Sequence, residues 1–193
     1  MNKLLRYGLL VCLCSLFLNG YAQWCEQLYS AHSYYDYTDY AAFNQAIDAS
    51  GYDAELLEAA IFHETNRQRV KYGLAPLKYD YNLMVCAHNH SVNMVQYDFF
   101  SHISPVPGKY SLGDRVKEVG YVNCGSAENI AEFPIQSTYA ESARYVVAEL
   151  WMNSPGHQKN ILNGKYTYLG SGAAYFVKSS TVYVRATQNF LQK

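Results

Sequence analysis

The sequence contains no run of basic residues, no C-x-x-C pair and no G-x-S-x-G motif. The first absence argues against nucleic-acid binding, because clustered Lys and Arg residues supply most of the contact with phosphates. The second removes a common signature of structural zinc sites. Without the third pattern, neither Ser101 nor Ser154 is presented as the nucleophile of an α/β-hydrolase. No catalytic residue is therefore predicted from motifs of this kind.

Long hydrophobic runs are also scarce, and the main one lies near the N-terminus. The apolar run 9–18 follows Lys3 and Arg6 and precedes a stretch of polar and small residues that ends at Gln23. This order is typical of a secretory signal peptide, and the run is short for a membrane span. We predict that residues 1–23 are cleaved and that the mature chain is secreted or periplasmic and is not an integral membrane protein. Cleavage changes the formal net charge from −1 to −3, which leaves a mildly acidic protein.

Cysteine is sparse for an exported protein. The chain has five cysteines, and Cys12 and Cys14 would leave with the signal peptide. An oxidising compartment permits one disulfide among Cys25, Cys86 and Cys124. We predict the pair Cys86–Cys124, because both residues fall within the periodic part of the chain. Three free, buried thiols are the alternative.

Tyrosine, by contrast, is abundant, with 20 residues in the chain. Many of them lie in residues 24–53, which we interpret as a Tyr-rich N-terminal extension with a short helix over 41–49. The extension either packs along the domain or presents an aromatic surface. Residues 54–193 are predicted to form one domain, and the mature chain of about 170 residues is long enough for one compact core.

The spacing of apolar residues predicts four helices and a C-terminal hairpin in this domain. The helices are expected over residues 54–72, 81–97, 111–119 and 138–153, and the strands over 127–131, 166–177 and 181–191. His88 and His90 lie two residues apart, so they cannot share a helical face. One inward-facing core histidine is favoured over a paired metal site.

The segment 151–162 joins the last helix to a sharp turn and a second short helix. Pro155 and Gly156 break the first helix, since Pro lacks the N–H group and Gly tolerates unusual backbone angles. His157 follows at once, so its imidazole is expected to project from a fixed corner. An incidental histidine on a surface turn is the alternative interpretation.

Four motifs in order give the chain a resemblance to a known family. They are NRQRVKYGLAPL at 66–77, FFSH at 99–102, AENIA at 127–131 and SPGHQKNIL at 154–162. Together they resemble the CAP superfamily (SCP-like; cysteine-rich secretory, antigen 5 and pathogenesis-related 1 proteins) in its short bacterial secreted form. The resemblance implies an α/β fold, a three-layer α-β-α sandwich with a small antiparallel sheet.

The resemblance also implies a cleft that many family members build from two His and two Glu. His102, Glu128 and His157 match three of these positions, whereas Ser154 stands where the second Glu is expected. Glu149 is a poor substitute because it lies about 140° around the helix from that position. Asn160 and Gln188 complete the predicted cleft residues.

Several interpretations of this cleft remain open at the level of sequence. Two imidazoles and one carboxylate could hold a divalent metal such as zinc, with water in the open position. The same trio could form a hydrogen-bonded network without metal, or could merely brace the core. We favour a secreted, non-enzymatic domain that needs no cofactor and binds a lipid, an envelope component or a partner protein. The alternative is a metal-assisted hydrolase using His102, Glu128 and His157.

Overall fold

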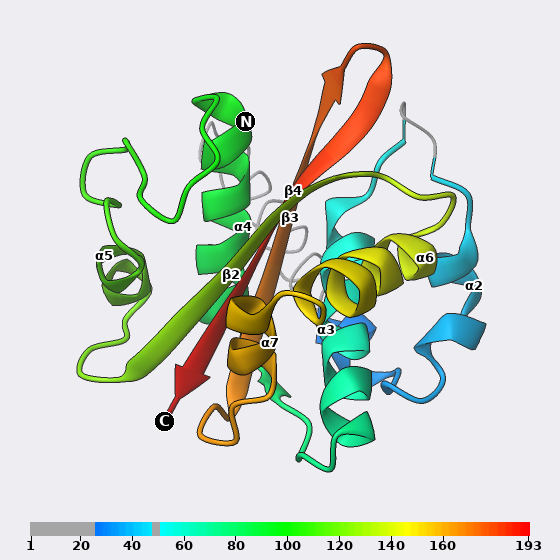
Figure 1. The fold of residues 1–193 in the computed structure, drawn as a ribbon, viewed down its shortest axis with the longest axis horizontal. Helices are drawn as coiled ribbons and strands as arrows, with labels where there is room; N and C mark the ends of the chain where they lie inside the picture. The colour runs from blue at the N-terminus through cyan, green and yellow to red at the C-terminus, as the bar shows by residue number, and fades with distance from the viewer. Residues whose placement is uncertain (1–25, 48–50) are drawn as a thin grey trace, which may run out of the picture.

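A four-stranded sheet lies at the centre of the computed structural model, which describes residues 26–47 and 51–193 (Figure 1). The strands are β1 (Lys78–Tyr79), β2 (Gly125–Pro134), β3 (Tyr168–Lys178) and β4 (Thr181–Gln192), in the order β1-β3-β4-β2. The predicted signal peptide 1–23 and Cys25 lie outside the described residues.

The sheet is antiparallel except at one edge. β3 and β4 form the predicted hairpin, and β2 pairs antiparallel with the other side of β4. The hairpin tip projects beyond the body of the protein in Figure 1. β1 is parallel to β3, but it pairs only through Lys78–Tyr168 and Tyr79–Leu169. Most of that edge of β3 therefore has no partner strand among the described residues.

The four predicted helices of the domain are present as α3 (Ala54–Lys71), α4 (Tyr81–Gln96), α5 (Leu112–Glu118), and α6 (Tyr139–Arg144) continued by the π-helix η2 (Tyr145–Trp151). The short helix predicted after the turn at Pro155 is α7 (Pro155–Ile161). The predicted helix 138–153 thus changes to π-helical winding after its first turns. The short helix expected over 41–49 is α2 (Ala41–Asn44), preceded by the 3₁₀-helix η1 (Tyr37–Asp39).

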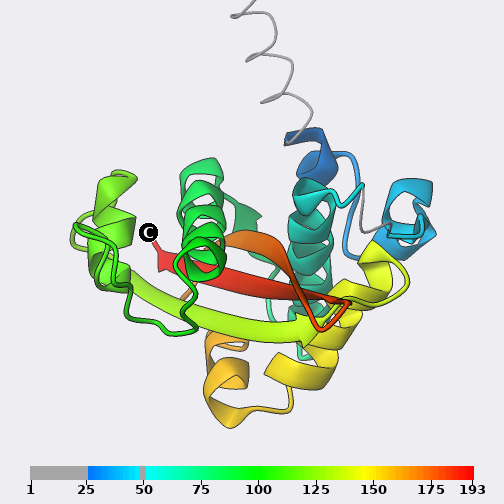
Figure 2. The same ribbon diagram turned by 90° about the horizontal axis from the view of Figure 1, so that it is seen from above.

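Helices cover both faces of the sheet, which confirms the predicted three-layer architecture. Figure 2 shows α4 and α5 on one side and α7 with η2 on the other. Two adjacent residues of β4 contact helices on opposite faces of the sheet, because successive side chains of a strand point to opposite faces. Thr187 accepts a hydrogen bond from Ser91 of α4, whereas Gln188 donates to Thr65 of α3.

Helix α4 lies directly on the backbone of β3. A Cβ atom added at Gly170 would come within 2.1 Å of the Leu83 carbonyl carbon, and one at Gly172 within 2.2 Å of that of Ala87. Any side chain at these positions would push the helix off the strand. The two glycines therefore fix the distance between α4 and the sheet, and with it the placement of the histidines of α4.

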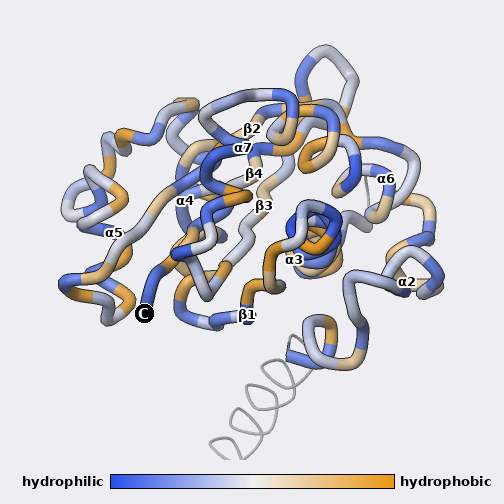
Figure 3. The backbone as a smooth tube through the Cα atoms, turned by 60° about the horizontal axis from the view of Figure 1, so that its bottom comes forward, coloured by the Kyte–Doolittle hydropathy of each residue, from blue (hydrophilic) through white to orange (hydrophobic). Residues whose placement is uncertain are grey.

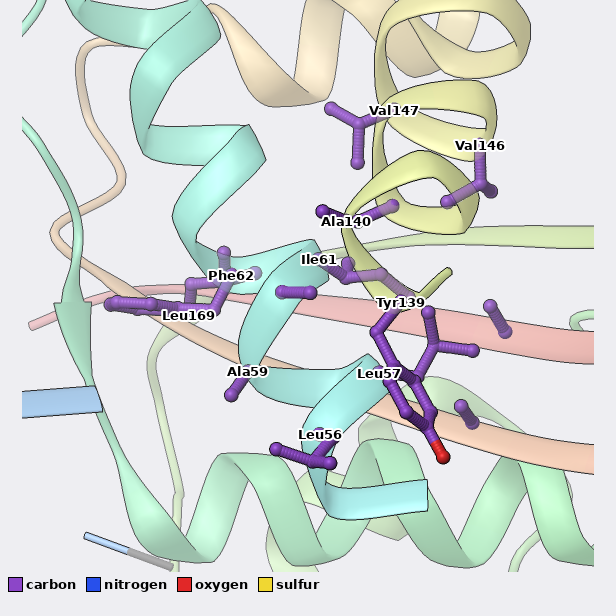
Figure 4. Close-up of a cluster of buried hydrophobic side chains, with 14 of the residues drawn as sticks. Leu56, Leu57, Ala59, Ile61, Phe62, Tyr139, Ala140, Val146, Val147 and Leu169 are labelled. Carbon is purple, nitrogen blue, oxygen red and sulfur yellow. The ribbon is translucent and has the colours of Figure 1, made fainter. Parts of the chain in front are cut away.

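The main core lies around α3, which is buried on almost every side. In Figure 4 Leu57 and Ile61 of α3 lie near Tyr139, Ala140 and Val147 of the neighbouring helical segment. Polar residues of α3 are buried as well, and the helix shows both hydrophilic and hydrophobic colours around its axis in Figure 3. These buried polar groups need partners inside the protein.

The described part of the Tyr-rich extension packs along the domain. Tyr37 is fully buried, and its hydroxyl donates to Glu64 of α3 over 2.6 Å. Ile47 donates its backbone N–H to Ser137, beside a single β-bridge between Ala46 and Thr138. Of the two possibilities left by the sequence, packing therefore applies to these residues.

The predicted disulfide Cys86–Cys124 is wrong, because both thiols are free. Cys86 lies on the buried face of α4 in a small cluster with Leu83 and Val116, and Cys124 packs against the same cluster. Burial raises the pKa of Cys86 to about 12, so its thiol stays protonated and behaves as a small apolar side chain. Counting cysteines could not reveal this role.

None of the helices in the described ranges combines the length and apolar character needed to cross a bilayer.

Candidate functional site

Strand β2 presents two adjacent polar residues to opposite sides of the sheet. Glu128 pairs with Asn189 of β4 in the strand register, and Asn129 pairs with Gln188. Because side chains alternate along a strand, Glu128 faces the layer of α4 and α5 and Asn129 faces the layer of α7. The predicted cleft residues are therefore divided between two faces.

Glu128 forms a buried ion pair with Arg115 of α5. Nη2 of Arg115 donates to both carboxylate oxygens, over 2.9 Å to Oε1 and 2.8 Å to Oε2, and both side chains are almost completely buried. Nη1 of Arg115 donates to the carbonyl oxygens of His102 and Lys109, each over 3.2 Å. A buried ion pair is tolerated when further hydrogen bonds satisfy the remaining donors. Nη1 has such partners here, whereas the buried Nε of Arg115 has none among the described residues.

His102 extends this pair toward solvent. Its Nδ1 lies 2.9 Å from Oε1 of Glu128, while its side chain is 53% exposed. Because an ionised carboxylate only accepts hydrogen bonds, Nδ1 carries the proton in this contact. Nε2 has no hydrogen-bond partner among the described residues and remains accessible. Glu128 therefore fixes both the tautomer and the orientation of an exposed imidazole.

Glu128 remains ionised despite its burial. Burial by itself raises the pKa of this carboxyl, but the hydrogen bond from His102 and the charge of Arg115 outweigh that effect and hold the pKa below its ordinary value. The Asn189 amide can add a donor to Oε2 over 3.1 Å while accepting from the Ala87 N–H. The carboxylate is thus fully supplied with donors.

Another histidine, His90, lies on the buried side of the Glu128–His102 contact. His90 of α4 is completely buried, donates from Nε2 to the Ser101 carbonyl over 3.1 Å and lies 3.8 Å from Oε1 of Glu128. Burial lowers its pKa to about 4, so the ring is neutral at physiological pH. Its Nδ1 has no partner among the described residues. The inward-facing core histidine expected from α4 is therefore confirmed in His90.

Sequence reasoning did not assign Arg115 or His90 to the site. A signal for Arg115 was available, because Leu112, Val116 and Val119 follow helical spacing and Arg115 lies on the same face. A charged residue on a helical face that should be buried points to a buried counter-charge. No comparable signal in the sequence connected His90 with Glu128.

On the opposite face, Asn129 organises the remaining predicted residues. Its amide nitrogen donates to the backbone carbonyl of His157 and to Oε1 of Gln188, each over 3.2 Å. Asn160 donates to Oδ1 of Asn129 over 2.8 Å and to the backbone carbonyl of Glu128 over 3.3 Å. These contacts fasten α7 to β2. Asn160 and Gln188 therefore fix the position of β2 and α7 on the face of the sheet opposite the Glu128 side chain.

His157 and Ser154 lie at the start of α7. Ser154 is the residue before its first turn, and its side chain makes no capping hydrogen bond. The pKa of the His157 imidazole is lowered by burial and, to a smaller extent, by the electrostatic effect of the nearby His102 imidazole. His157 therefore lies within electrostatic range of His102, although no direct hydrogen bond joins it to His102 or Glu128.

The predicted metal set of His102, Glu128 and His157 is not assembled. Within residues 26–47 and 51–193, no group of three or more His, Cys, Asp or Glu side chains is arranged to hold a metal ion. The physical reason is visible at Glu128, whose two oxygens are already occupied by Arg115. A metal bound by Glu128 would have to displace this buried guanidinium, whose Nη2 contacts both carboxylate oxygens.

The exposed edge of the pair lines a hollow of about 360 Å³. Its walls are His102, Ile103, Leu112 and Glu128, and Ile103 is 45% exposed. The hollow thus combines one oriented imidazole with two aliphatic side chains. Such a surface can hold an apolar group and fix one polar atom beside it.

Comparison with known proteins agrees with this architecture. The model of the cysteine-rich secretory protein (CAP) family matches residues 62–190, more than half of the chain. The chain belongs to the CAP family. Its curated relatives include YkwD of Bacillus subtilis, 37% identical over 144 residues, which is 75% of this chain and 48% of YkwD. The membrane protein YlbC of the same organism is 39% identical over 139 residues, 70% of this chain and 34% of YlbC.

Solved structures show the same fold in this CAP domain. An extracellular protein of Bacillus anthracis that contains an SCP domain is 33% identical, with a TM-score of 0.57 over 72% of this chain and 41% of that one. An outer surface protein of Borrelia burgdorferi has a TM-score of 0.56 over 77% of this chain and 98% of that one, at 17% identity. The chain spans less than half the length of the curated relatives it matches.

Proposed function

We propose that this protein is a secreted CAP domain that binds an amphipathic ligand, a lipid or another envelope component, in the hollow beside His102, without metal and without catalysis. The signal-like N-terminus supports secretion. So do the extracellular protein of Bacillus anthracis and the outer surface protein of Borrelia burgdorferi to which it is similar. A partner protein that inserts an apolar side chain is an alternative occupant.

The observation that carries the proposal is the Glu128–Arg115 ion pair. It satisfies the buried carboxylate, and Glu128 in turn orients His102. His102 then offers Nε2 beside Ile103 and Leu112, which suits a ligand with one polar atom next to an apolar body. Binding uses all of these features, whereas none of them supplies a nucleophile.

One observation favours the alternative of a hydrolase. A carboxylate that orients an exposed imidazole is also the arrangement of a general base. Hydrolysis additionally needs a nucleophile or an activated water, and donors for the oxyanion. Ser101, the neighbouring hydroxyl in sequence, accepts a hydrogen bond from the Ile103 N–H. No metal-holding group is available in the described part of the chain to activate a water.

The test is binding of lipid to the purified mature protein, measured with phosphatidylglycerol vesicles and with fluorescently labelled lipid. We expect His102→Gln to weaken binding by about tenfold, as the loss of one oriented hydrogen bond in an apolar hollow predicts. His32→Gln, in the N-terminal extension, is the matched control and should bind like the wild type. Equal binding by His102→Gln and wild type would refute the proposal.

Zinc separates binding from metal-assisted hydrolysis. Because Arg115 occupies the carboxylate of Glu128, added zinc should leave the melting temperature unchanged at pH 7.5. A zinc-dependent rise that disappears in His102→Gln would show that the ion pair opens to admit a metal. Zinc-dependent turnover of a peptide or envelope substrate, lost in the same variant, would establish the hydrolase instead.

A further inference from the structure

A second histidine–glutamate pair closes the free edge of β3. β1 covers this edge only as far as Leu169, and β3 continues to Lys178. At Ala173 the outward-facing backbone N–H donates to Oε1 of Glu58, a residue of α3, over 2.9 Å. Glu58 is only 1% exposed. At this position a buried carboxylate accepts the hydrogen bond that a neighbouring strand would otherwise accept.

The same carboxylate oxygen holds His88 of α4. Nδ1 of His88 lies 2.6 Å from Oε1 of Glu58, and the His88 side chain is 39% exposed. This pair is separate from the cleft, because His88 and His90 leave α4 in different directions. His90 contacts Ser101 and Glu128, whereas His88 contacts Glu58. No hydrogen bond to the His88 Nε2 comes from the described residues.

A pocket of about 420 Å³ lies beside His88. Its walls are mainly apolar and include Val92 and Val95 of α4, Ala174 and Tyr175 of β3, and Tyr52. The rings of Tyr52 and Tyr175 lie 4.5 Å apart. The hydroxyl of Tyr52 is buried and makes no hydrogen bond within the described part of the chain. We call this space the β3-edge pocket.

Charges around the pocket disfavour a charged ligand of either sign. The hydrogen bond that His88 donates to Glu58, together with the negative charges of Glu58 and Glu55 of α3, raises the pKa of the His88 imidazole. A carboxylate ligand would be repelled by the nearby carboxylates of Glu55 and Glu58, while an ammonium ligand would be repelled by His88 when that imidazole carries a proton on both nitrogens. The side chains of Tyr52 and Tyr175 add phenol groups to the wall of the pocket. An uncharged hydrogen-bond acceptor meets neither repulsion.

We propose that the β3-edge pocket is a second binding site, for a small uncharged molecule with an apolar body and one carbonyl or amide oxygen. The apolar body lies on Val92, Val95 and Ala174. The oxygen accepts a hydrogen bond from the Nε2–H group of His88 in its protonated form, in which Nδ1 donates to Glu58 and Nε2 is a donor as well. This site acts independently of the hollow at His102.

The test compares three probes that share one apolar body, using the mature chain at pH 6.5. They are 3-phenylpropionamide, which is neutral, 3-phenylpropionate and 3-phenylpropylamine. Calorimetry, or the NMR signal of the His88 ring, gives each dissociation constant. We expect the amide to bind about tenfold more tightly than either charged probe. Equal or tighter binding of the acid or the amine, or no saturable binding of the amide, would overturn the proposal.

Two variants locate the binding. Val92→Phe fills the pocket while leaving Glu58 and His88 in place, so it should abolish binding of the amide while keeping the His88 ring signal of the free protein. His88→Gln should weaken the amide by about tenfold through loss of the donor. His102→Gln should bind the amide like the wild type, so a failure here is distinguishable from a failure at the cleft. Unchanged binding by Val92→Phe contradicts the proposed location.

Discussion

The two histidine–glutamate pairs of this protein share a geometry but differ in their electrostatics. In each, a buried glutamate holds Nδ1 of a partly exposed histidine, at 2.6 Å for Glu58–His88 and 2.9 Å for Glu128–His102. Both oxygens of Glu128 also accept hydrogen bonds from Nη2 of Arg115. Glu58 accepts from His88 and from one backbone N–H, that of Ala173. Of the two pairs, the one at Glu128 contains a permanent cation.

This difference sets the two carboxyl pKa values in opposite directions. Burial raises the pKa of Glu58, and the opposing hydrogen bond from His88 does not cancel it. At Glu128 the same burial is outweighed by His102 and Arg115, and the pKa falls below its ordinary value. A histidine loses its positive charge when the pH rises above its pKa, so it stabilises a buried carboxylate only while it is protonated. An arginine stays charged across this whole pH range.

The pairs therefore respond to pH with opposite signs. The depressed pKa of Glu128 contributes stability that is present above pH 4.5, the unfolded value, and is lost as the pH falls through the folded pKa. The raised pKa values of Glu58 and His88 contribute stability that is present at low pH. That contribution is lost as the pH rises through their folded pKa values.

The largest expected effect comes from removing the permanent cation. Arg115→Met leaves Glu128 buried with only a histidine as its cationic partner, and should lower the free energy of unfolding by about 3–5 kcal/mol. Urea denaturation at pH 7 measures the loss. Lys109→Met breaks the more exposed pair with Glu118 and serves as the control, with an expected loss of about 0–1 kcal/mol. Equal losses in both variants would mean that Arg115 is not the decisive partner.

A somewhat smaller effect is expected from the neutral histidine behind Glu128. Burial lowers the pKa of His90 to about 4, and that of His63, in α3, also to about 4. Such groups stabilise the fold above their unfolded pKa of 6.5 and lose this contribution as the pH falls from 6.5 toward 4. Each should contribute about 3 kcal/mol to the loss.

Comparing unfolding free energies at pH 7 and pH 4 tests this expectation. His90→Gln removes one of these groups and should reduce the loss on acidification by about 3 kcal/mol relative to the wild type. An unchanged loss in His90→Gln would show that His90 binds its proton equally well in the folded and unfolded chain.

The third prediction concerns the Glu58–His88 pair, whose charge depends on pH. Glu58→Gln keeps an acceptor for Ala173 and His88 but removes the charge, so the cost in stability should be about 1 kcal/mol or less. The pKa of His88 should fall, because its raised value depends first on Glu58. Titration of the His88 ring by NMR checks this, with the His102 ring as an internal reference. A His88 pKa unchanged by the substitution would contradict the pairing.

The smallest effect concerns the thiols. Peptide mapping after alkylation of the denatured, non-reduced protein should find both Cys86 and Cys124 labelled. In the native protein Cys124, which is partly exposed, should react before the buried Cys86. A peptide containing a Cys86–Cys124 bridge would overturn this description of the cluster beside α5.

The fold was predictable from the sequence, whereas the partners within the site were only partly so. Apolar spacing identified α3, α4 and the β3–β4 hairpin, because burial of one face enforces that spacing. The resemblance identified His102 and Glu128, which do meet. It could not show that Arg115 occupies the carboxylate, since the residue types at His102, Glu128 and His157 suit a metal equally well.

The second pair escaped sequence reasoning for a geometric reason. Glu58 and His88 meet beyond the end of β1, where no strand pairs with β3 and the N–H of Ala173 donates to Glu58 instead. The length of an edge strand is poorly encoded by a short local pattern such as Lys78–Tyr79. Likewise, the spacing of Cys86 and Cys124 along the chain does not reveal whether their sulfur atoms can bond.

Arg115 thus sets the charge state of one buried glutamate, while the charge state of the other depends on a histidine. Carbon-13 NMR titration of the side-chain carboxyls of Glu58 and Glu128 in one sample tests this difference most directly. We expect Glu128 to titrate below the ordinary pKa of 4.5 and Glu58 above it. Two similar pKa values, or the reverse order, would contradict the assigned roles of Arg115 and His88.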